Sequence, residues 1–365
     1  MIRVANWPGE LQFEAGGVGK LGEFVDGLGA GRALVVCGKT VAGGEMLERV
    51  RAGLGSRCAG VFDGAQMHTP LVTVLEAANL FLQEKADLII SVGGGSAVDT
   101  GKGIALMIAG GGELEPYRLK ETPHRPLPPD ALPHISVPTV PRPASDFLPF
   151  ATILDPETET KMRFQDPLLV PKITVLDARL SAHCGPGLTA STGLGAMVRC
   201  FENLYSKDRN PLSSGLAPSA LGLLAHALPL GISEPDNLKA REDCFYASVM
   251  VAMAGGAAGV NVIHAIGLAI GVRYKLPHGL PHAILAPPAM KALLGDAERP
   301  AREALGSGED AAQSFARLVG EMGVDPHLRA HGIERSNLLS IAQAAVPLPM
   351  MAHAPRPVEA AEINL

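Results

Sequence analysis

Several features that would place this chain in a special class are missing from its sequence. Lysine and arginine form no basic run, and 31 of them are set against 37 aspartates and glutamates, for a formal net charge of −6. A chain of this charge repels phosphate backbones, so nucleic acid is not an expected partner. The five cysteines are odd in number, far apart and without CxxC spacing. Neither a disulfide framework nor a zinc knuckle is therefore expected, and a reducing cytoplasm fits best.

The sequence also has no clear membrane signal. The first 17 residues lack the apolar core of a signal peptide. The longest weakly polar stretch, Ala247 to Ile270, is interrupted by four glycines and carries Asn261 and His264. This pattern favours a pair of buried helices over a membrane span. We expect a soluble, cytoplasmic protein with no membrane contact.

What the chain does have is enough apolar sequence for two domains. It has 365 residues, 47% of them apolar, and domains usually take roughly 100–200 residues. Short apolar runs at 31–37, 86–92 and 134–138 predict buried strands, and apolar residues at helical spacing predict helices at 45–54, 70–85 and 97–109. Strand and helix alternate, as in a parallel sheet covered on both faces.

The second half of the chain has a different character. Its segments are rich in Ala, Leu and Gly, are mostly helical in period and are separated by Pro or Gly; they are 188–205, 211–229, 238–256, 259–273 and 280–294. The sequence therefore predicts an α/β, Rossmann-like dinucleotide-binding domain at 1–150. An all-α substrate domain is expected at 151–365.

A glycine-rich turn is the strongest local signal for chemistry. It consists of Gly93-Gly94-Gly95-Ser96, between the strand expected at 86–92 and the helix expected at 97–109. Glycines let backbone N–H groups approach a phosphate closely, and the positive end of the following helix favours its charge. A pyrophosphate would fit here, although three glycines can also serve only to make a tight turn.

Taken with its surroundings, the chain resembles the iron-containing alcohol dehydrogenase superfamily, which includes dehydroquinate synthase-like proteins. The resemblance covers most of the chain and is carried by the glycine turn and by residues 136–139, 145–146, 188–193, 277–279 and 355–357. Within the superfamily it is closest to the maleylacetate reductases, through residues 62–70 and 204–211. It implies that the turn, with Asp99, Lys102 and Thr139, binds the pyrophosphate of NADH or NADPH.

The chain departs from this superfamily at the metal. Most members hold a divalent ion with an Asp and a His one helical turn apart, a third His on a later helix and a fourth ligand in a P-H-G motif. Here these positions read Gly195, Arg199, His264 and His278. Two imidazoles without a carboxylate hold iron or zinc weakly, and a guanidinium would repel the cation. We therefore expect no bound metal.

Arg199 is the most informative of these departures. It shares a helix face with Gly195 and Glu202, and the resemblance places that face on the wall of the substrate cleft. We interpret it as a cation that takes the place of the metal and neutralises an anionic, carboxylate-bearing substrate. The alternative is an ordinary charge on a helix surface.

Three histidines cluster in the second half: His264, His278 and His282. They could form a three-imidazole metal site, but Arg199 is near and no Asp or Cys completes the set. Proton donation is the favoured role, because imidazole titrates near working pH and can protonate a carbonyl oxygen as hydride reaches the carbon. The resemblance places His264 and His278 near the nicotinamide, whereas His282 can be a core histidine.

The adenosine end of the cofactor is less well defined. A Rossmann-type acid would bind the ribose hydroxyls, but the first apolar strand ends in Cys37-Gly38-Lys39-Thr40. Lys39 could face a 2′-phosphate or could simply be solvated. The sequence therefore does not choose between NADH and NADPH.

These features together predict a metal-independent NAD(P)H-dependent reductase of a small keto acid, similar to maleylacetate reductases, working as a homodimer. Its catalytic residues would be His264, His278 and Arg199. The same scaffold could instead perform a non-redox biosynthetic step, such as elimination, isomerisation or cyclisation, because a fold does not fix a function. A catalytically silent nucleotide-binding protein is disfavoured by the glycine turn and the two retained histidines.

Overall fold

The chain forms two compact units, and the computed structural model describes residues 9–119, 124–143, 145–155, 157 and 160–363. The α/β unit comprises the described residues of 6–140 and 144–181. The helical unit comprises those of 141–143 and 182–365. The sequence predicted a boundary at residue 150, whereas the units divide after residue 181.

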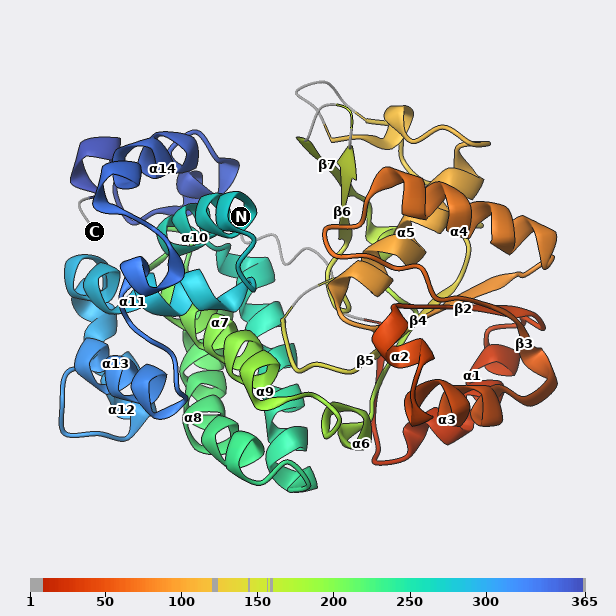
Figure 1. Ribbon diagram of the computed structural model, residues 1–365, viewed down its shortest axis with the longest axis horizontal. Coiled ribbons are helices and arrows are strands. Elements are labelled where there is room, and N and C mark those ends of the chain that lie inside the picture. Colours follow the sequence, from red (N-terminus) through yellow and green to blue (C-terminus); the bar gives the residue numbers. More distant parts are fainter. Residues whose placement is uncertain (1–8, 120–123, 144, 156, 158–159, 364–365) are drawn as a thin grey trace. The chain divides into compact units, whose positions relative to one another are not determined.

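Six parallel strands form the sheet of the α/β unit, in the order β1-β8-β5-β4-β2-β3 (Figure 1). They are β1 (Glu10–Phe13), β2 (Ala33–Cys37), β3 (Cys58–Phe62), β4 (Leu88–Gly93), β5 (His134–Pro138) and β8 (Ile173–Leu176). An antiparallel pair, β6 (Phe150–Asp155) and β7 (Thr160–Gln165), follows β5 in sequence. Because β8 lies between β1 and β5, the chain up to residue 181 belongs to this unit. The three strands predicted from sequence are confirmed as β2, β4 and β5.

Helices cover both faces of this sheet. They are α1 (Leu21–Gly27), α2 (Lys39–Ala42), α3 (Glu45–Leu54), α4 (Leu71–Gln83), α5 (Gly95–Ala109) and α6 (Ala178–Ser181). Val35 and Ile90 are buried in one core cluster with side chains of α1 and α3, whereas Val36 and Ile89 are buried in another with side chains of α4 and α5. Successive strand residues point to opposite faces, so a sheet buried on both sides needs continuous apolar runs. The helices predicted at 45–54, 70–85 and 97–109 are confirmed as α3, α4 and α5.

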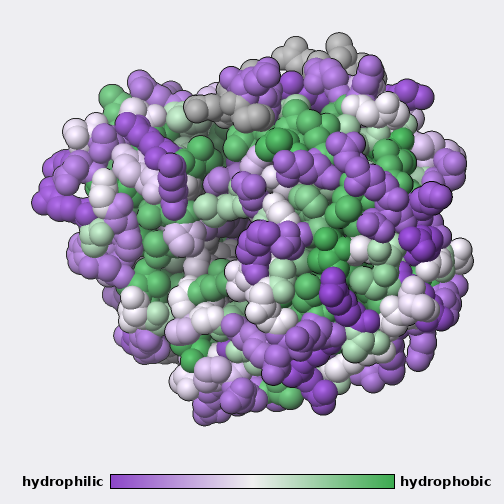
Figure 2. Space-filling view, turned by 45° about the vertical axis from the view of Figure 1, so that its right-hand side comes forward, coloured by the Kyte–Doolittle hydropathy of each residue, from purple (hydrophilic) through white to green (hydrophobic). Residues whose placement is uncertain are grey.

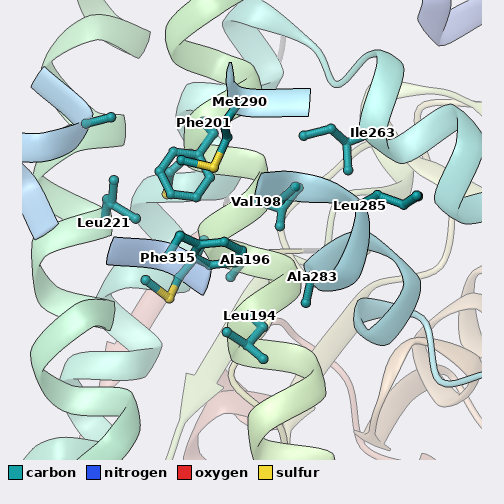
Figure 3. Close-up of a cluster of buried hydrophobic side chains, with 14 of the residues drawn as sticks. Leu194, Ala196, Val198, Phe201, Leu221, Ile263, Ala283, Leu285, Met290 and Phe315 are labelled. Carbon is teal, nitrogen blue, oxygen red and sulfur yellow. The ribbon is translucent and has the colours of Figure 1, made fainter. Parts of the chain in front are cut away.

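The helical unit is built around α7. Its helices are α7 (Pro186–Tyr205), α8 (Pro211–Ser233), α9 (Leu238–Ala258), α10 (Val262–Tyr274), α11 (Gly279–Leu293), α12 (Glu298–Leu305), α13 (Ala311–Glu321) and α14 (Leu338–Ala345). Figure 3 shows side chains of α7, α8, α10, α11 and α13 meeting in its core. Phe201 of α7 packs edge to face on Phe315 of α13, with ring centroids 5.1 Å apart. The all-helical character predicted for 151–365 is confirmed for the described residues from 182 on, whereas it is wrong for 151–181, where β6, β7 and β8 lie.

Glycines allow α7 to approach its neighbours closely. A Cβ on Gly193 would lie 2.4 Å from the side chain of Leu228, and one on Gly195 would lie 3.1 Å from the Cα of Gly279. A Cβ on Gly279 would lie 1.7 Å from the carbonyl oxygen of Ser191, so only glycine fits there. This close crossing of α7 and α11 sets the distance between the side chains that form the candidate site.

Among the described residues, one helix is long and apolar enough to cross a membrane by length and composition alone. It is α8, and it packs in the helical unit against α7, α9 and α12. A core helix passes the same test, so this is weak evidence for a span. The weakly polar stretch from Ala247 to Ile270 forms the end of α9 and most of α10, the helix pair predicted for it. Figure 2 shows hydrophilic side chains interspersed with hydrophobic ones over the face it presents.

Candidate active site

The glycine turn begins with Gly93, the last residue of β4, and leads into the start of α5, between a strand and a helix as predicted. Gly93 has a φ of 138°, in the region that favours glycine, and Gly94 is extended at the N-cap of the helix. No side chain caps this end of α5. Its first backbone N–H groups, on a 15-residue helix, are thus available to an anion.

The space beside Gly94 is open. A Cβ built on Gly94 would meet no described atom within 4 Å. The glycine at this position is therefore not required by packing against the protein, in contrast to Gly101, where a Cβ would lie 2.4 Å from the hydroxyl oxygen of Ser91. A group that needs the close approach of the backbone, such as a phosphate, explains Gly94 better than the fold does.

Of the other residues predicted to bind the cofactor, Thr139 and Ser96 lie at the turn, whereas Asp99 contacts β6. The backbone N–H of Thr139 donates to the carbonyl oxygen of Gly93 at 3.3 Å, which places Thr139 beside the turn. Ser96 lies in the first turn of α5, and its carbonyl oxygen accepts from the hydroxyl of Thr100 at 2.7 Å. Asp99 instead accepts from the backbone N–H of Thr152 at 3.4 Å, so it helps to hold β6.

Lys102 has a structural role that the sequence did not reveal. Its side chain is buried, and the ammonium donates to the carbonyl oxygens of Ser145, Leu148 and Phe150 at 2.6, 2.6 and 2.9 Å. An ammonium has three protons. Since these three carbonyls take them up, Lys102 holds the segment 145–150 rather than a phosphate.

Lys39 is exposed after β2, on the edge where the parallel strands end. Its ammonium pairs with the carboxylate of Asp63 at 2.7 Å, and Asp63 follows the neighbouring strand β3. The acid missing after β2 is thus supplied after β3. An exposed pair of this kind is weak, so the carboxylate of Asp63 can exchange Lys39 for hydroxyl groups, and the ammonium of Lys39 can exchange Asp63 for a phosphate.

In the helical unit, three helices bring a second set of predicted residues together. Arg199 comes from α7 and His264 from α10, while His278 is the N-cap residue of α11. The sequence analysis assigned no catalytic role to two further members, Glu202 on α7 and His282 on α11. Glu202 lies three residues after Arg199 and is fully buried. Residues at i and i+3 lie on one helix face, so this spacing is the sequence signal that places Glu202 beside Arg199.

Glu202, His264 and Arg199 form one hydrogen-bonded chain. The Glu202 carboxylate accepts from the backbone N–H of His264 at 3.0 Å and from Nδ1 of the same residue. Nε2 of His264 accepts from Nε of Arg199 at 3.3 Å. Nη1 of Arg199 donates to the carbonyl oxygen of Pro143 at 2.8 Å. The guanidinium predicted to replace the metal is therefore fixed on two sides.

Burial changes the titration of this chain of groups. It raises the pKa of Glu202 to about 7, partly offset by hydrogen bonds from His264 and Asn261 and by the charges of His282 and Arg199. It lowers the pKa of His264 well below its usual value, and Arg199 lowers it further. It lowers the pKa of Arg199 to about 10, so the guanidinium stays charged at neutral pH.

The three imidazoles lie close together. The ring centroid of His282 is 4.3 Å from that of His264 and 4.6 Å from that of His278, and their possible ligand atoms lie within 4.8 Å of one another. Nδ1 of His282 donates to the carbonyl oxygen of His278, and its buried Nε2 has no partner among the described residues. Burial lowers the pKa of His282 to about 3. Only His278 is exposed.

The fold, an α/β unit followed by a helical unit, and these two sets of residues are typical of an NAD(P)-dependent oxidoreductase. Comparison with known proteins supports this class. The sequence model of the iron-containing alcohol dehydrogenases matches residues 8–178, and that of the C-terminal part of the Fe-containing alcohol dehydrogenase family matches residues 189–364. The chain belongs to the iron-containing alcohol dehydrogenase family.

Its relatives include two kinds of enzyme. The 1,3-propanediol dehydrogenase of Citrobacter freundii is 32% identical over 299 residues, which cover 78% of this chain and 76% of that protein. The maleylacetate reductase of Rhizobium sp. (strain MTP-10005) is 30% identical over 360 residues, covering 98% and 94%. The crystal structure of a 1,3-propanediol oxidoreductase matches with a TM-score of 0.92 at 28% identity, over 98% of this chain and 97% of that one.

Proposed function

We propose that this oxidoreductase is a metal-independent reductase of a small, anionic keto acid, with a substrate similar to that of its maleylacetate reductase relatives. The observation that carries the proposal is the fixed guanidinium of Arg199. It lies at a position where the resemblance predicts a metal ligand, and two hydrogen bonds hold it there. A cation bonded in this way is suited to a carboxylate.

The residues around Arg199 do not fit the iron of the family. Two of the four positions, Gly195 and Arg199, carry no ligand atom, and α11 approaches Gly195 too closely for a larger residue to fit without a shift. The lone pair of His264 that would bind a metal accepts a hydrogen bond from a permanent cation. His282 could add a third imidazole to those of His264 and His278. This set of three imidazoles contains no carboxylate ligand, and the positive charge of Arg199 would repel a metal ion.

The chain's own groups suffice for carbonyl reduction in this proposal. The open turn at Gly93–Ser96 would hold the pyrophosphate of NADH or NADPH, which supplies a hydride when bound. Arg199 would bind a carboxylate beside the reacting carbon. As the carbonyl oxygen gains negative charge, an imidazole N–H would meet it and supply the proton that completes the alcohol.

The two predicted proton donors are not equally suited to this step. His264 uses both ring nitrogens, Nδ1 toward Glu202 and Nε2 toward Arg199. His278 is exposed, so a substrate can reach it. We therefore assign proton donation to His278 and leave His264 to hold the arginine. The proposal also includes a cytoplasmic homodimer that takes either NADH or NADPH.

The test combines elemental analysis with an activity assay. Purified protein should contain no stoichiometric iron or zinc, and it should oxidise NADH or NADPH in the presence of one or more members of a panel of keto acids, with no loss of rate after a chelator. Arg199→Met should raise KM for the acid roughly tenfold or more, as expected for a lost charge-assisted hydrogen bond. Arg209→Met, which removes an exposed arginine paired with Asp296 in the same unit, is the control.

Two results would contradict the proposed function. About one iron or zinc per chain, with activity that disappears on chelation, would show that the enzyme uses a metal. If the unmodified protein reduces no keto acid of the panel with either cofactor, the non-redox alternative gains support.

A further inference from the structure

We propose that Glu202 is a positioning residue, which acts through His264 to aim the Arg199 guanidinium at the anionic group of the substrate. The inference rests on the proposed function, because it presumes that Arg199 binds that group. It starts from the hydrogen atoms that the contacts of Glu202 require.

An ionised carboxylate only accepts, so above the pKa of Glu202 its contact places the ring hydrogen of neutral His264 on Nδ1. The second carboxylate oxygen accepts the backbone N–H of the same histidine at 3.0 Å, which fixes the carboxylate against α10. Nδ2 of Asn261 also donates to the main-chain carbonyl of Glu202 at 3.3 Å. Glu202 and His264 are both buried, so water does not compete for these bonds. The tautomer of His264 is therefore decided by Glu202.

The tautomer in turn decides what Arg199 can do. With its hydrogen on Nδ1, His264 presents a lone pair at Nε2, which accepts from Nε of Arg199 at 3.3 Å. The other tautomer would present an N–H to the N–H of Arg199, and two donors repel. Only the first tautomer holds the guanidinium by its Nε edge.

The remaining edge of the guanidinium is left for a ligand. Nη1 donates to the carbonyl oxygen of Pro143, and the structure gives Nη2 of Arg199 no hydrogen-bond partner among the residues it describes. A guanidinium held at Nε and Nη1 has a fixed plane, so Nη2 points in one direction. This fixed direction is what a substrate carboxylate requires, because less freedom is lost when it binds.

The decisive variant is Glu202→Gln. The glutamine is of similar size but has an NH₂ group, which can donate to Nδ1 of His264 and so move the ring hydrogen to Nε2. We expect the ¹⁵N NMR spectrum of the histidines to show His264 as the Nδ1–H tautomer in the unmodified protein and as the Nε2–H tautomer in the variant. KM for the anionic substrate should rise about tenfold, with a smaller change in kcat. Glu202→Asp, which keeps the carboxylate, should recover part of the affinity.

A control and a second readout separate folding from positioning. Glu242→Gln removes a carboxylate from α9 of the same unit and should change neither tautomer nor KM. The thermal midpoint shows whether Glu202→Gln is folded, and if it is not, the tautomer of His264 in the unmodified protein tests the inference. An Nε2–H tautomer in the unmodified protein, or an unchanged KM in a folded variant whose tautomer has switched, would overturn the inference. If the unmodified protein reduces no keto acid, the proposed function fails, whereas the NMR result still tests whether Glu202 sets the tautomer.

Discussion

At the scale of single residues, the chemistry of a histidine depends on which of its nitrogens is free. His264 has a carboxylate on one side and a guanidinium on the other, 62 and 65 residues away in sequence. Its Nε2 accepts a hydrogen bond from Arg199, so this nitrogen carries no hydrogen that it could donate to a substrate. His278 matches the same family motif set but is exposed at the start of α11. The donor role fits His278 for this reason.

This assignment gives a prediction for His278→Gln. The variant should lower kcat about 10²–10³-fold, as is typical when one preorganised donor to a developing oxyanion is lost, and should change KM little. Steady-state kinetics with the keto acid of the main assay measure both constants. His226→Gln, on the exposed surface of α8, is the matched control. A wild-type kcat in His278→Gln would remove the residue from the mechanism.

At the scale of elements, the segment from β4 to α5 combines a structural and a binding task. Gly93 and Gly101 are needed by the fold, the first for its positive φ and the second for lack of space. Neither backbone conformation nor lack of space requires a glycine at position 94, since its φ is −86° and its surroundings are open. Gly94, which neither criterion explains, is therefore the glycine whose replacement tests whether a cofactor binds at this turn.

We accordingly predict that Gly94→Val abolishes binding of NADH and NADPH without unfolding the protein. The valine side chain would extend into the space that a pyrophosphate needs and would meet no described atom of the protein at its Cβ. Fluorescence titration with each cofactor and a thermal melt measure the two effects. Gly27→Val, at the exposed end of α1 with equally open surroundings, should bind normally. Undiminished binding by Gly94→Val would mean that the turn is only structural.

At the scale of the whole molecule, each unit buries a neutral histidine. In the α/β unit, His134 on β5 contacts the hydroxyl of Ser91 at 2.8 Å through Nε2, and burial together with Lys102 lowers its pKa to about 3. In the helical unit, His282 has a similarly lowered pKa. Between pH 6.5 and 3 the unfolded chain binds more protons at these residues than the folded one does. Their contribution to stability is complete above pH 6.5 and is lost as the pH falls.

The protein should therefore lose stability in mild acid. For His134 the loss between pH 7.5 and pH 5 is roughly 2 kcal/mol, since each pKa unit corresponds to about 1.4 kcal/mol. Urea unfolding at the two pH values measures it, and His134→Gln should make the difference smaller by about that amount. His226→Gln, which changes an exposed histidine of α8, should leave the difference as it is. An equal acid sensitivity in His134→Gln would show that His134 is charged or accessible in the folded protein.

The sequence by itself determined the class of fold and the place of the glycine turn. Both follow from local patterns: continuous apolar runs predict strands buried on both faces, and a glycine run between a strand and a helix predicts an anion-binding turn. The helices predicted in both halves lie within a few residues of the observed ones. The position of the unit boundary did not follow, because β8 belongs to the first unit through its pairing with β1 and β5, which the sequence does not show.

The tertiary structure alone decided what the charged and titratable groups do. Lys102 was expected at a phosphate, but three carbonyls of a segment more than 40 residues later surround its ammonium. Glu202 and His282 gained their importance only where α7, α10 and α11 meet. A hydrogen bond depends on atoms within about 3 Å, and chain folding brings such atoms together from distant parts of the sequence. Local patterns therefore fix elements and turns, whereas partners, tautomers and pKa values depend on the packed structure.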